Sequence, residues 1–531
     1  MCIVNEGLSG SSIMAVTTQD EKKSCFEAAL NSTGFGKYNI AMLLSCCLVI
    51  LGMYMDIFGF SIVMPAVACD MDLSTSQQGL LSAMPLIGVM LSSYAWGLCA
   101  DTMGRRTTLV LAMPVGVILN FAASMAPTYT VLAVLKFMSA SFTSSANAAA
   151  FVLMGESVPG RHRSRFMFLM ASSTMVVQLI ISSFALSVFN LSFRVEISWL
   201  YMEYRPWRLL LQIISLPGLF GVLSVALLNE SPKFLLSTDR NDDALDVLKS
   251  IYSWNTGMNR HTFPIGYVYL EEQSVNKDEG ISFLRKMWNQ TAPLFKPPLL
   301  KNSLILYYIL MCAYMTSTGY TMWVPTMTNA YFNGDSADGL TFCEVASKSA
   351  TTSNSTSTDC DSIIQATTLY AVMCYSGVSA IATVLLSFIV EPLGKKATTL
   401  LVFVISIVCG LLLLFIKIPL LSIALFYVFL YVALILGNVN TYLVELNPTH
   451  LRGMATCLSV VVARGFGFFS VQLIASLLAN YCLPMISGYL LLVISGLVVS
   501  LFLPADVKRK SQDYEEHNTA INSNPCDKTA K

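Results

Sequence analysis

Three ionisable residues, Asp56, Lys136 and Arg464, stand inside long apolar runs. A charge at the centre of a membrane-spanning helix costs at least roughly 2.5 kcal/mol, which makes each of them a candidate functional group. Asp56 lies about 16 residues into its run from the inner face of the membrane, which places it roughly 24 Å above that face. Lys136 lies about 7 residues into its run from the outer face, which places it roughly 10 Å below that face. In hydrocarbon about 30 Å thick these depths nearly coincide.

The pair of Asp56 and Lys136 has two interpretations. As a proton-linked pair, protonation of Asp56 would release Lys136 and shift the balance between two conformations. As a static ion pair, the two residues would orient their helices, and loss of one partner would destabilise the fold. The residues alone favour neither interpretation.

Arg464 lies about 10 residues into its run, near the middle, between the small residues Ala463 and Gly465. No other acid is expected at that depth in this half of the chain. We expect its planar donors to bind an anionic substrate through a carboxylate or sulfate group. Two competing interpretations pair Arg464 with Asp56, or let it cap backbone carbonyls near Asn438.

The composition predicts the scaffold that holds these residues. Of 531 residues, 12% are charged and 55% are hydrophobic, with a mean hydropathy of +0.62, whereas an average soluble domain has about 25% charged residues. Runs of about 20 apolar residues are long enough to cross a bilayer as helices. We predict an all-α integral membrane protein with twelve spans, at 40–68, 78–100, 107–126, 129–154, 166–190, 208–228, 302–330, 366–390, 397–416, 420–444, 454–480 and 484–503.

The positions of Lys and Arg set the expected orientation, because cytoplasmic loops keep positive charge. With both termini in the cytoplasm, the cations expected to face outward are Arg194, Arg205, Arg208, Lys348 and Lys417. Residues 1–38 lack a cleavable signal and are expected, like 504–531, to be a flexible cytoplasmic tail. Between the tails we expect a six-helix bundle at 39–228, a cytoplasmic linker with short helices at 229–301, and a second six-helix bundle at 302–503.

The longest outward loop, 331–365, is rich in Ser and Thr. It carries Cys343, Cys360 and the glycosylation sequon that starts at Asn354. An oxidising, glycosylating compartment suits these features. We predict a disulfide between Cys343 and Cys360 and a glycan on Asn354.

Two loop motifs recur along the chain at intervals of 290 and 289 residues. After the second run, Gly97 is followed by Asp101, Gly104, Arg105 and Arg106, and these four match Glu391, Gly394, Lys395 and Lys396 after the eighth. Glu156 and Arg163 after the fourth run match Glu445 and Arg452 after the tenth. Two motifs repeating at nearly one interval indicate a duplicated six-span unit. Their acids and bases can form ion pairs that gate a rocking motion, or they can fix only topology and helix ends.

These motifs resemble those of the major facilitator superfamily, over all twelve predicted spans. The stretch that starts at Asn229 and contains Glu230 is similar to an element that follows span six in sugar porters. The stretch from Met55 to Arg106 and the Pro206–Arg208 stretch resemble the synaptic vesicle glycoprotein 2-like group. Vertebrate members of that group have a longer N-terminal tail and a large lumenal domain between spans seven and eight, where this chain has residues 1–38 and 331–365. The paired glutamines of sugar porters are missing from span seven, so a hexose is not the expected substrate.

The resemblance implies two pseudo-symmetric bundles and a cavity lined by spans one, four, seven and ten. Proton-driven sugar porters are similar in placing an acid in span one opposite a cation in span four. Anion-selective organic ion transporters are similar in their span-eleven Arg. Tyr314, Tyr320 and Trp323 of span seven then either stack on substrate or pack between helices.

We therefore expect a monomeric, non-enzymatic transporter of a small organic ion, with an anion favoured, in the plasma membrane or a secretory or synaptic vesicle membrane. The alternative is a vesicle membrane protein that acts in trafficking or as a binding scaffold. A formal net charge of zero argues against a nucleic-acid partner. No metal-ligand cluster, cofactor motif or ATP-binding Walker motif is present, so the bilayer and a small solute are the expected partners.

Overall fold

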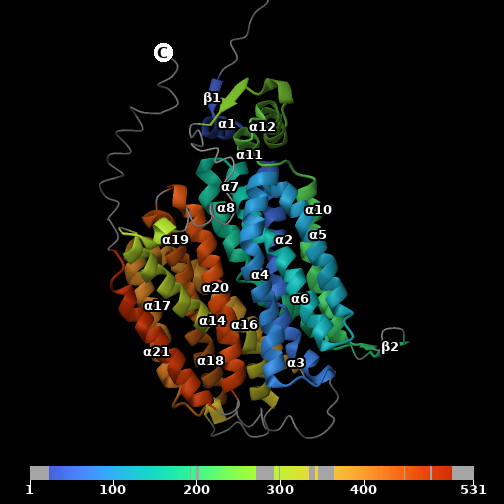
Figure 1. Ribbon diagram of the computed structural model, residues 1–531, viewed down its shortest axis with the longest axis vertical. Coiled ribbons are helices and arrows are strands. Elements are labelled where there is room, and N and C mark those ends of the chain that lie inside the picture. Colours follow the sequence, from blue (N-terminus) through green and yellow to red (C-terminus); the bar gives the residue numbers. More distant parts are fainter. Residues whose placement is uncertain are drawn as a thin grey trace, which may run out of the picture.

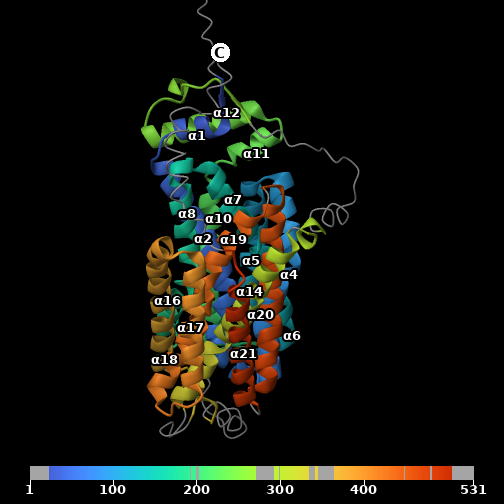
Figure 2. The same ribbon diagram turned by 90° about the vertical axis from the view of Figure 1, so that its left-hand side faces the viewer.

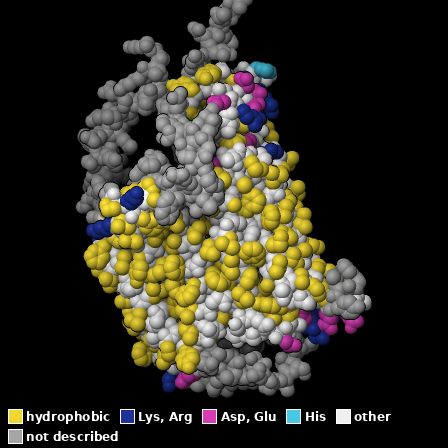
Figure 3. Space-filling model, in the orientation of Figure 1, with side chains coloured by type: hydrophobic (Ala, Val, Ile, Leu, Met, Phe, Trp, Pro, Cys, Tyr) yellow, Lys and Arg dark blue, Asp and Glu magenta, His cyan; other side chains and the backbone are white. Residues whose placement is uncertain are grey.

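The computed structural model describes residues 23–191, 193–198, 202–270, 292–297, 299–333, 341–344, 364–447, 449–478 and 481–504. Its helices form two bundles that stand side by side, and a small domain sits over one end of the first bundle (Figures 1 and 2). Hydrophobic side chains cover the bundles, whereas charged side chains gather on the small domain and near the opposite end (Figure 3). This distribution is the one a bilayer requires.

The first bundle begins with a helix that is interrupted at Gly59, giving α2 and α3. Its helices are α2 (Lys37–Phe58), α3 (Phe60–Asp70), α4 (Thr75–Met103), α5 (Arg105–Ser124), α6 (Tyr129–Thr143), α7 (Ser145–Ser157), α8 (Gly160–Ser173), α9 (Val177–Val188) and α10 (Pro206–Ala226). A short antiparallel hairpin of β2 (Val195–Ile197) and β3 (Met202–Tyr204) precedes α10.

The second bundle starts with α14, which is 34 residues long and contains Pro325. Its elements are α14 (Leu300–Asn333), α16 (Ala366–Leu393), α17 (Lys395–Leu413), α18 (Pro419–Leu430), η5 (Tyr431–Ile435), α19 (Leu436–Leu446), α20 (Thr449–Leu477) and α21 (Cys482–Ser500). The 3-10 turn η3 (Ala292–Phe295) precedes α14.

Eleven helical segments of the described chain are long and apolar enough to cross a membrane. They coincide with eleven of the twelve predicted spans. The helix α14, which contains the predicted seventh span, is not among the eleven. It carries the polar run from Thr316 to Thr318, whose side chains are buried inside the protein, and the Ser317 hydroxyl donates to the Ala313 carbonyl one turn earlier on the same helix.

The small domain joins the N-terminal region to the segment between the bundles. It consists of β1 (Lys23–Cys25), α1 (Phe26–Ser32), α11 (Pro232–Ser237), α12 (Asn241–Thr256), η2 (Arg260–Thr262) and β4 (Tyr267–Tyr269), and β1 pairs in parallel with β4. Phe26 and Leu30 of α1 are buried against Phe234 and Leu248. The prediction of a flexible tail through residue 38 is therefore wrong from residue 23 onward, because α1 has an apolar face that the later segment covers.

The two bundles meet mainly along three pairs of helices: α4 with α20, α9 with α16, and α3 with α14. One close contact between the bundles lies at the end opposite the small domain, where α4 begins and α20 ends (Figure 1). A Cβ added at Gly79 would lie 2.4 Å from Cβ of Ala475 and 3.5 Å from the ring of Trp323. Only a glycine permits this contact, so the bundles are closed at that end.

Candidate functional site

Asp56 and Lys136 form an ion pair inside the first bundle. The Lys136 side chain is fully buried and that of Asp56 is 3% exposed. Lys136 Nζ also donates to the Asp56 carbonyl at 2.9 Å, three residues before the break at Gly59, and to Asn120 Oδ1 at 3.0 Å. The three protons of the ammonium group thus have three acceptors.

The second carboxylate oxygen of Asp56 is also occupied. Ser139 donates to Oδ2 at 2.8 Å and Thr143 donates to it at 3.1 Å. Both residues follow Lys136 on α6 at helical spacing, so they share its face. Asp56 and Lys136 therefore belong to a buried network in which the ammonium and both carboxylate oxygens have partners, which is what makes a buried ion pair tolerable.

Arg464 of α20 reaches from the second half of the chain to the first. Its side chain is buried, and its guanidinium lies over two rings of α2, 5.6 Å from the centre of Tyr54 and 5.8 Å from that of Phe58. The two rings stack on each other with centres 5.8 Å apart. Tyr314 of α14 lies near both Tyr54 and Arg464.

No hydrogen bond or ion pair joins the Arg464 guanidinium to another group within the described ranges. The competing interpretation that pairs it with Asp56 is wrong, because both oxygens of that carboxylate are taken by α6. The carbonyl-capping interpretation is also wrong, and Asn438 donates instead to the Lys395 carbonyl at 3.3 Å. The guanidinium of Arg464, a residue that is 5% exposed, is left between the two halves without an acid partner in the described ranges.

Tyr320 and Trp323 do not join Arg464. Tyr320 is fully buried in an aromatic cluster within the second bundle, edge-on to Phe426 and Tyr489. Trp323 donates through Nε1 to the Val471 carbonyl at 3.3 Å. Both side chains pack between helices, which leaves Tyr314 as the aromatic residue of the predicted set that lies beside Arg464.

The loop after α4 is held by ion pairs within the first half. Arg105 contacts Asp101 and Glu156, each at 3.2 Å. The Ser231 hydroxyl also donates to the Glu156 carboxylate. Gly97 of the same motif is partly exposed and has open space where a Cβ would lie.

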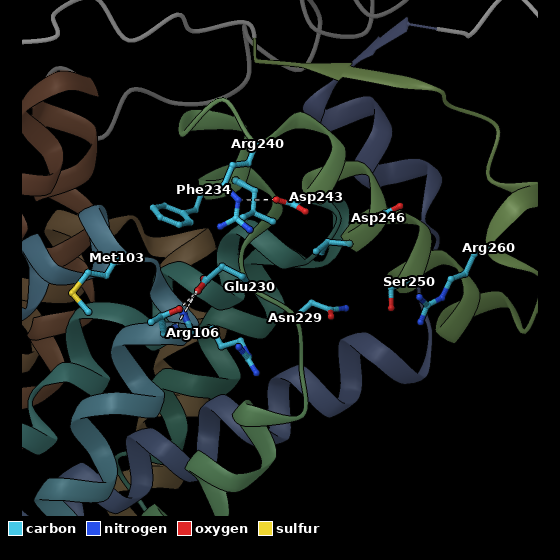
Figure 4. Close-up of a pocket in the computed structure, with 13 residues that line it drawn as sticks. Met103, Arg106, Asn229, Glu230, Phe234, Arg240, Asp243, Asp246, Ser250 and Arg260 are labelled. Carbon is cyan, nitrogen blue, oxygen red and sulfur yellow. Dashed lines mark hydrogen bonds and ion pairs between the residues drawn. The ribbon is translucent and has the colours of Figure 1, made fainter.

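Glu230 caps the N-terminus of α5. Its carboxylate accepts from the backbone N–H of Arg106 at 2.9 Å and of Thr107 at 3.0 Å, an arrangement that the helix dipole favours. Figure 4 shows Glu230 directed at Arg106 on one side of a polar pocket of about 480 Å³ between α5 and the small domain. The Arg106 guanidinium donates to the carbonyls of Val225 and Ala226 at the end of α10.

The second half repeats this arrangement. Lys396 donates to the carbonyls of Leu501 and Leu503 just after α21, as Arg106 does at the end of α10. Gly104 and Gly394 have nearly the same backbone conformation, with φ of +103° and +88° and ψ of 153° at both. The duplication is thus present in the backbone conformation of the loops as well as in their sequence. Lys395 lies over the ring of Tyr442 at 5.8 Å. The side chains of Glu391, Glu445 and Arg452 lie outside the described part.

Arg163 does not pair with Glu156 in this conformation. It binds both carboxylate oxygens of Glu27 in α1, at 3.0 and 3.1 Å. This partner stands in the N-terminal region, 136 residues away, where no motif signals it. Arg163 therefore ties the small domain to α8.

The predicted disulfide between Cys343 and Cys360 is wrong. Cys343 is bonded to Cys482 at the start of α21, with Cα atoms 5.4 Å apart, and a sulfur forms one disulfide only. The partner lies 139 residues further along the chain, a pairing that cysteine spacing cannot reveal. Cys360 and Asn354 lie outside the described residues.

Several functional candidates escape a search for charge alone. Ser139 and Thr143 have a readable signal, since they follow Lys136 by three and seven residues on one helical face. Asn120, which binds Lys136, and Tyr54 and Phe58, which face Arg464, carry no such signal. Their roles depend on contacts between helices that the sequence does not specify.

Two bundles of membrane-length helices, related by repeated loops and enclosing buried charges, define an α-helical membrane transporter built from a duplicated unit. The sequence profile of the Major Facilitator Superfamily matches residues 46–471. The chain belongs to that family. The all-α multi-pass fold is confirmed. The family consists of transmembrane transporters and not of enzymes.

Relatives of known sequence include synaptic vesicle glycoprotein 2A of Homo sapiens, 21% identical over 58% of this chain and 44% of that protein. The chain thus spans less than half the length of this relative. The Caenorhabditis elegans protein svop-1 is 25% identical over 92% of this chain and 86% of its own. Among solved structures, the inward-open xylose transporter XylE from E. coli is 15% identical with a TM-score of 0.62, over 89% of this chain and 98% of that one.

Proposed function

We propose that this chain transports a small organic anion by alternating access between its two bundles. The observation that carries the proposal is the buried guanidinium of Arg464, which faces aromatic rings of the other half and has no acid partner in the described ranges. A substrate that binds Arg464 contacts both halves at once. It would therefore bind differently in the two conformations, as a transported solute must.

Charge balance supports an anion over a cation or a sugar. Burying an unpaired cation costs several kcal/mol, and the rings of Tyr54 and Phe58 return only about 0.5–2 kcal/mol by cation–π attraction. A carboxylate or sulfate supplies the missing charge and matches the planar donors of Arg464. Tyr314 adds a hydroxyl beside the same guanidinium.

The contact between Gly79 and Ala475 supports a rocking mechanism. It closes one end of the interface between α4 and α20, so solute would reach Arg464 from the end that carries the small domain. The ion pairs of Arg105 with Asp101 and Glu156 lie within one half. They hold that half as a rigid unit while it moves. The distribution of Lys and Arg favours a cytoplasmic small domain.

We assign the pair of Asp56 and Lys136 to holding span one against span four. A proton-coupling role needs a conformation in which water reaches Asp56, and both carboxylate oxygens are covered here. The network is complete without a substrate or a proton. Coupling through this pair is tested below by removing its charges together and singly.

A second candidate function is a trafficking or binding role in a vesicle membrane, which the similarity to synaptic vesicle glycoprotein 2A favours. Such a protein needs no unpaired charge at its centre, so Arg464 argues for transport. The membrane would be the plasma membrane or a vesicle membrane in either case, and a monomer suffices for both functions.

Uptake into proteoliposomes tests the proposal. The purified full chain is assayed with a panel of organic anions, organic cations and sugars, at two external pH values. Saturable uptake of at least one organic anion, and not of cations or sugars, is the expected result. Uptake confined to cations or sugars would contradict the anion, and a lack of uptake with every solute would favour the scaffold.

A further inference from the structure

A groove of about 550 Å³ runs along the second bundle between α14, α20 and α21. Its walls are apolar side chains: Met315 of α14, Leu473 and Leu477 of α20, and Met485 and Leu492 of α21. Two of these helices, α20 and α21, belong to segments that are apolar enough to cross a membrane. The groove therefore lies at the depth of the hydrocarbon.

The floor of the groove is open at Gly488. No heavy atom lies within 4 Å of the point where a Cβ would stand. On the same helix, Leu483 and Leu491 are 55% and 65% exposed. In a membrane-spanning protein such side chains face lipid, so the groove opens towards the bilayer and is filled from it.

The groove offers one free polar group. The hydroxyl of Tyr489 is bonded to Ser470. Tyr481, which is 58% exposed at the start of α21, forms no side-chain hydrogen bond within the described part of the chain. From Tyr481 to Leu492 the helix rises about 16 Å. Among the described residues that line the groove, Tyr481 thus supplies the one hydroxyl without a partner, at one end of a long apolar surface, and none of them is charged.

We propose that this groove binds a membrane sterol, with the sterol hydroxyl at Tyr481 and the ring system over Gly488. A phospholipid head group carries charges that the groove cannot pair. A flexible acyl chain also loses rotamer freedom when it is held in one place, whereas a rigid ring system has little to lose. A flat, rigid hydrocarbon with one hydroxyl fits both features.

Photolabelling in vesicles of defined composition tests the proposal. The full chain is reconstituted in phosphatidylcholine with either a photoactivatable cholesterol analogue or a phosphatidylcholine that carries the photoactivatable group on its acyl chain. The labelled peptides are then identified by mass spectrometry. The sterol probe is expected to label the segments around Leu473 and Gly488, in competition with unlabelled cholesterol.

Gly488→Leu fills the groove without a clash and is expected to lower sterol labelling about tenfold, equivalent to about 1.4 kcal/mol of binding. Gly437→Leu is the matched control, because Gly437 is another helical glycine with open space around it that lies outside the groove. It should label as the natural protein does. Tyr481→Phe, which removes only the hydroxyl, should lower labelling about threefold.

Three results would overturn the sterol site. The first is equal labelling of the natural protein and Gly488→Leu. The second is equal loss in Gly488→Leu and Gly437→Leu. The third is stronger labelling of the same peptides by the phosphatidylcholine probe, which would make the occupant an acyl chain. None of these readouts depends on transport of an anion, so the sterol site and the proposed function stand or fall separately.

Discussion

The guanidinium carbon of Arg464 lies 5.6 Å from the ring centre of Tyr54, so a cation of the second half rests on an aromatic face of the first. Asp56 follows two positions later on the same helix, about 200° around its axis. The helix α2 thus presents an aromatic face to Arg464 and a carboxylate to Lys136 on opposite sides. This geometry keeps Asp56 from neutralising Arg464, as the proposed binding of an anionic solute requires.

Removal of one member of the buried ion pair should destabilise the first bundle. Lys136→Met leaves the Asp56 carboxylate unpaired, and Asp56→Asn leaves the ammonium unpaired, each at a cost of about 3–5 kcal/mol. The double variant removes both charges and should recover most of the loss. The unfolding temperatures of the purified single and double variants measure these changes in stability.

Transport in the same variants tests proton coupling. The static assignment predicts that the double variant keeps the pH dependence of uptake of the natural protein. A pH dependence that disappears in the double variant, at normal membrane levels, would show that the pair carries a proton step.

Gly104 and Gly97 belong to one motif but should tolerate substitution differently. Gly104 has a φ of +103°, and a Cβ there would lie 2.5 Å from the Glu230 carboxylate that caps α5. Gly104→Ala should therefore lower stability by more than about 1 kcal/mol and reduce transport. Gly97→Ala has open space and serves as the control. Equal effects of both substitutions on the unfolding temperature would contradict this interpretation.

A cross-link at the closed end should stop the transport cycle. In the variant with Gly79→Cys and Ala475→Cys, the two Cβ atoms start 2.4 Å apart, so the helices must separate by about 1 Å to reach the Cβ–Cβ distance of a disulfide. Oxidation should abolish uptake, and a reducing agent should restore it, while either single substitution should be insensitive to oxidation. Full uptake by the cross-linked protein would mean that this end does not open during transport.

The disulfide that replaces the predicted one is directly testable. Peptide mapping under non-reducing conditions should recover Cys343 joined to Cys482. Cys343→Ser and Cys482→Ser should lower the unfolding temperature equally, because each breaks the same bond. A peptide that joins Cys343 to Cys360 would restore the pairing expected from the loop alone.

The repeated motifs made the duplicated scaffold predictable, since the spacing of Gly104 and Arg106 recurs at Gly394 and Lys396. The proximity of Asp56 and Lys136 followed from their depths, because helical rise converts residue counts into ångströms. The partners of Arg163 and Cys343 were not predictable. Each lies more than 130 residues away, where nothing in the local pattern specifies contact.

The span containing Tyr314 shows another limit of the sequence. Aromatic residues three or more positions apart looked equivalent there, but Tyr320 packs among helices of its own bundle, Trp323 bonds the Val471 carbonyl, and Tyr314 lies near Arg464. Which face of a helix meets the cavity depends on its rotation in the bundle. Periodicity cannot give that rotation for a helix that is buried on most sides.

The central claim concerns Arg464, and uptake of the organic anion found with the natural protein tests it most directly. Arg464→Ala should lower the uptake efficiency about tenfold to a hundredfold, as expected for the loss of a charged hydrogen-bond donor. Arg464→Lys keeps the charge without the planar donors, so its uptake efficiency should lie between those of the natural protein and Arg464→Ala. Arg260→Ala removes a surface arginine of the small domain as a control and should have no effect. Anion uptake by Arg464→Ala at the natural rate and membrane level would contradict the proposed site.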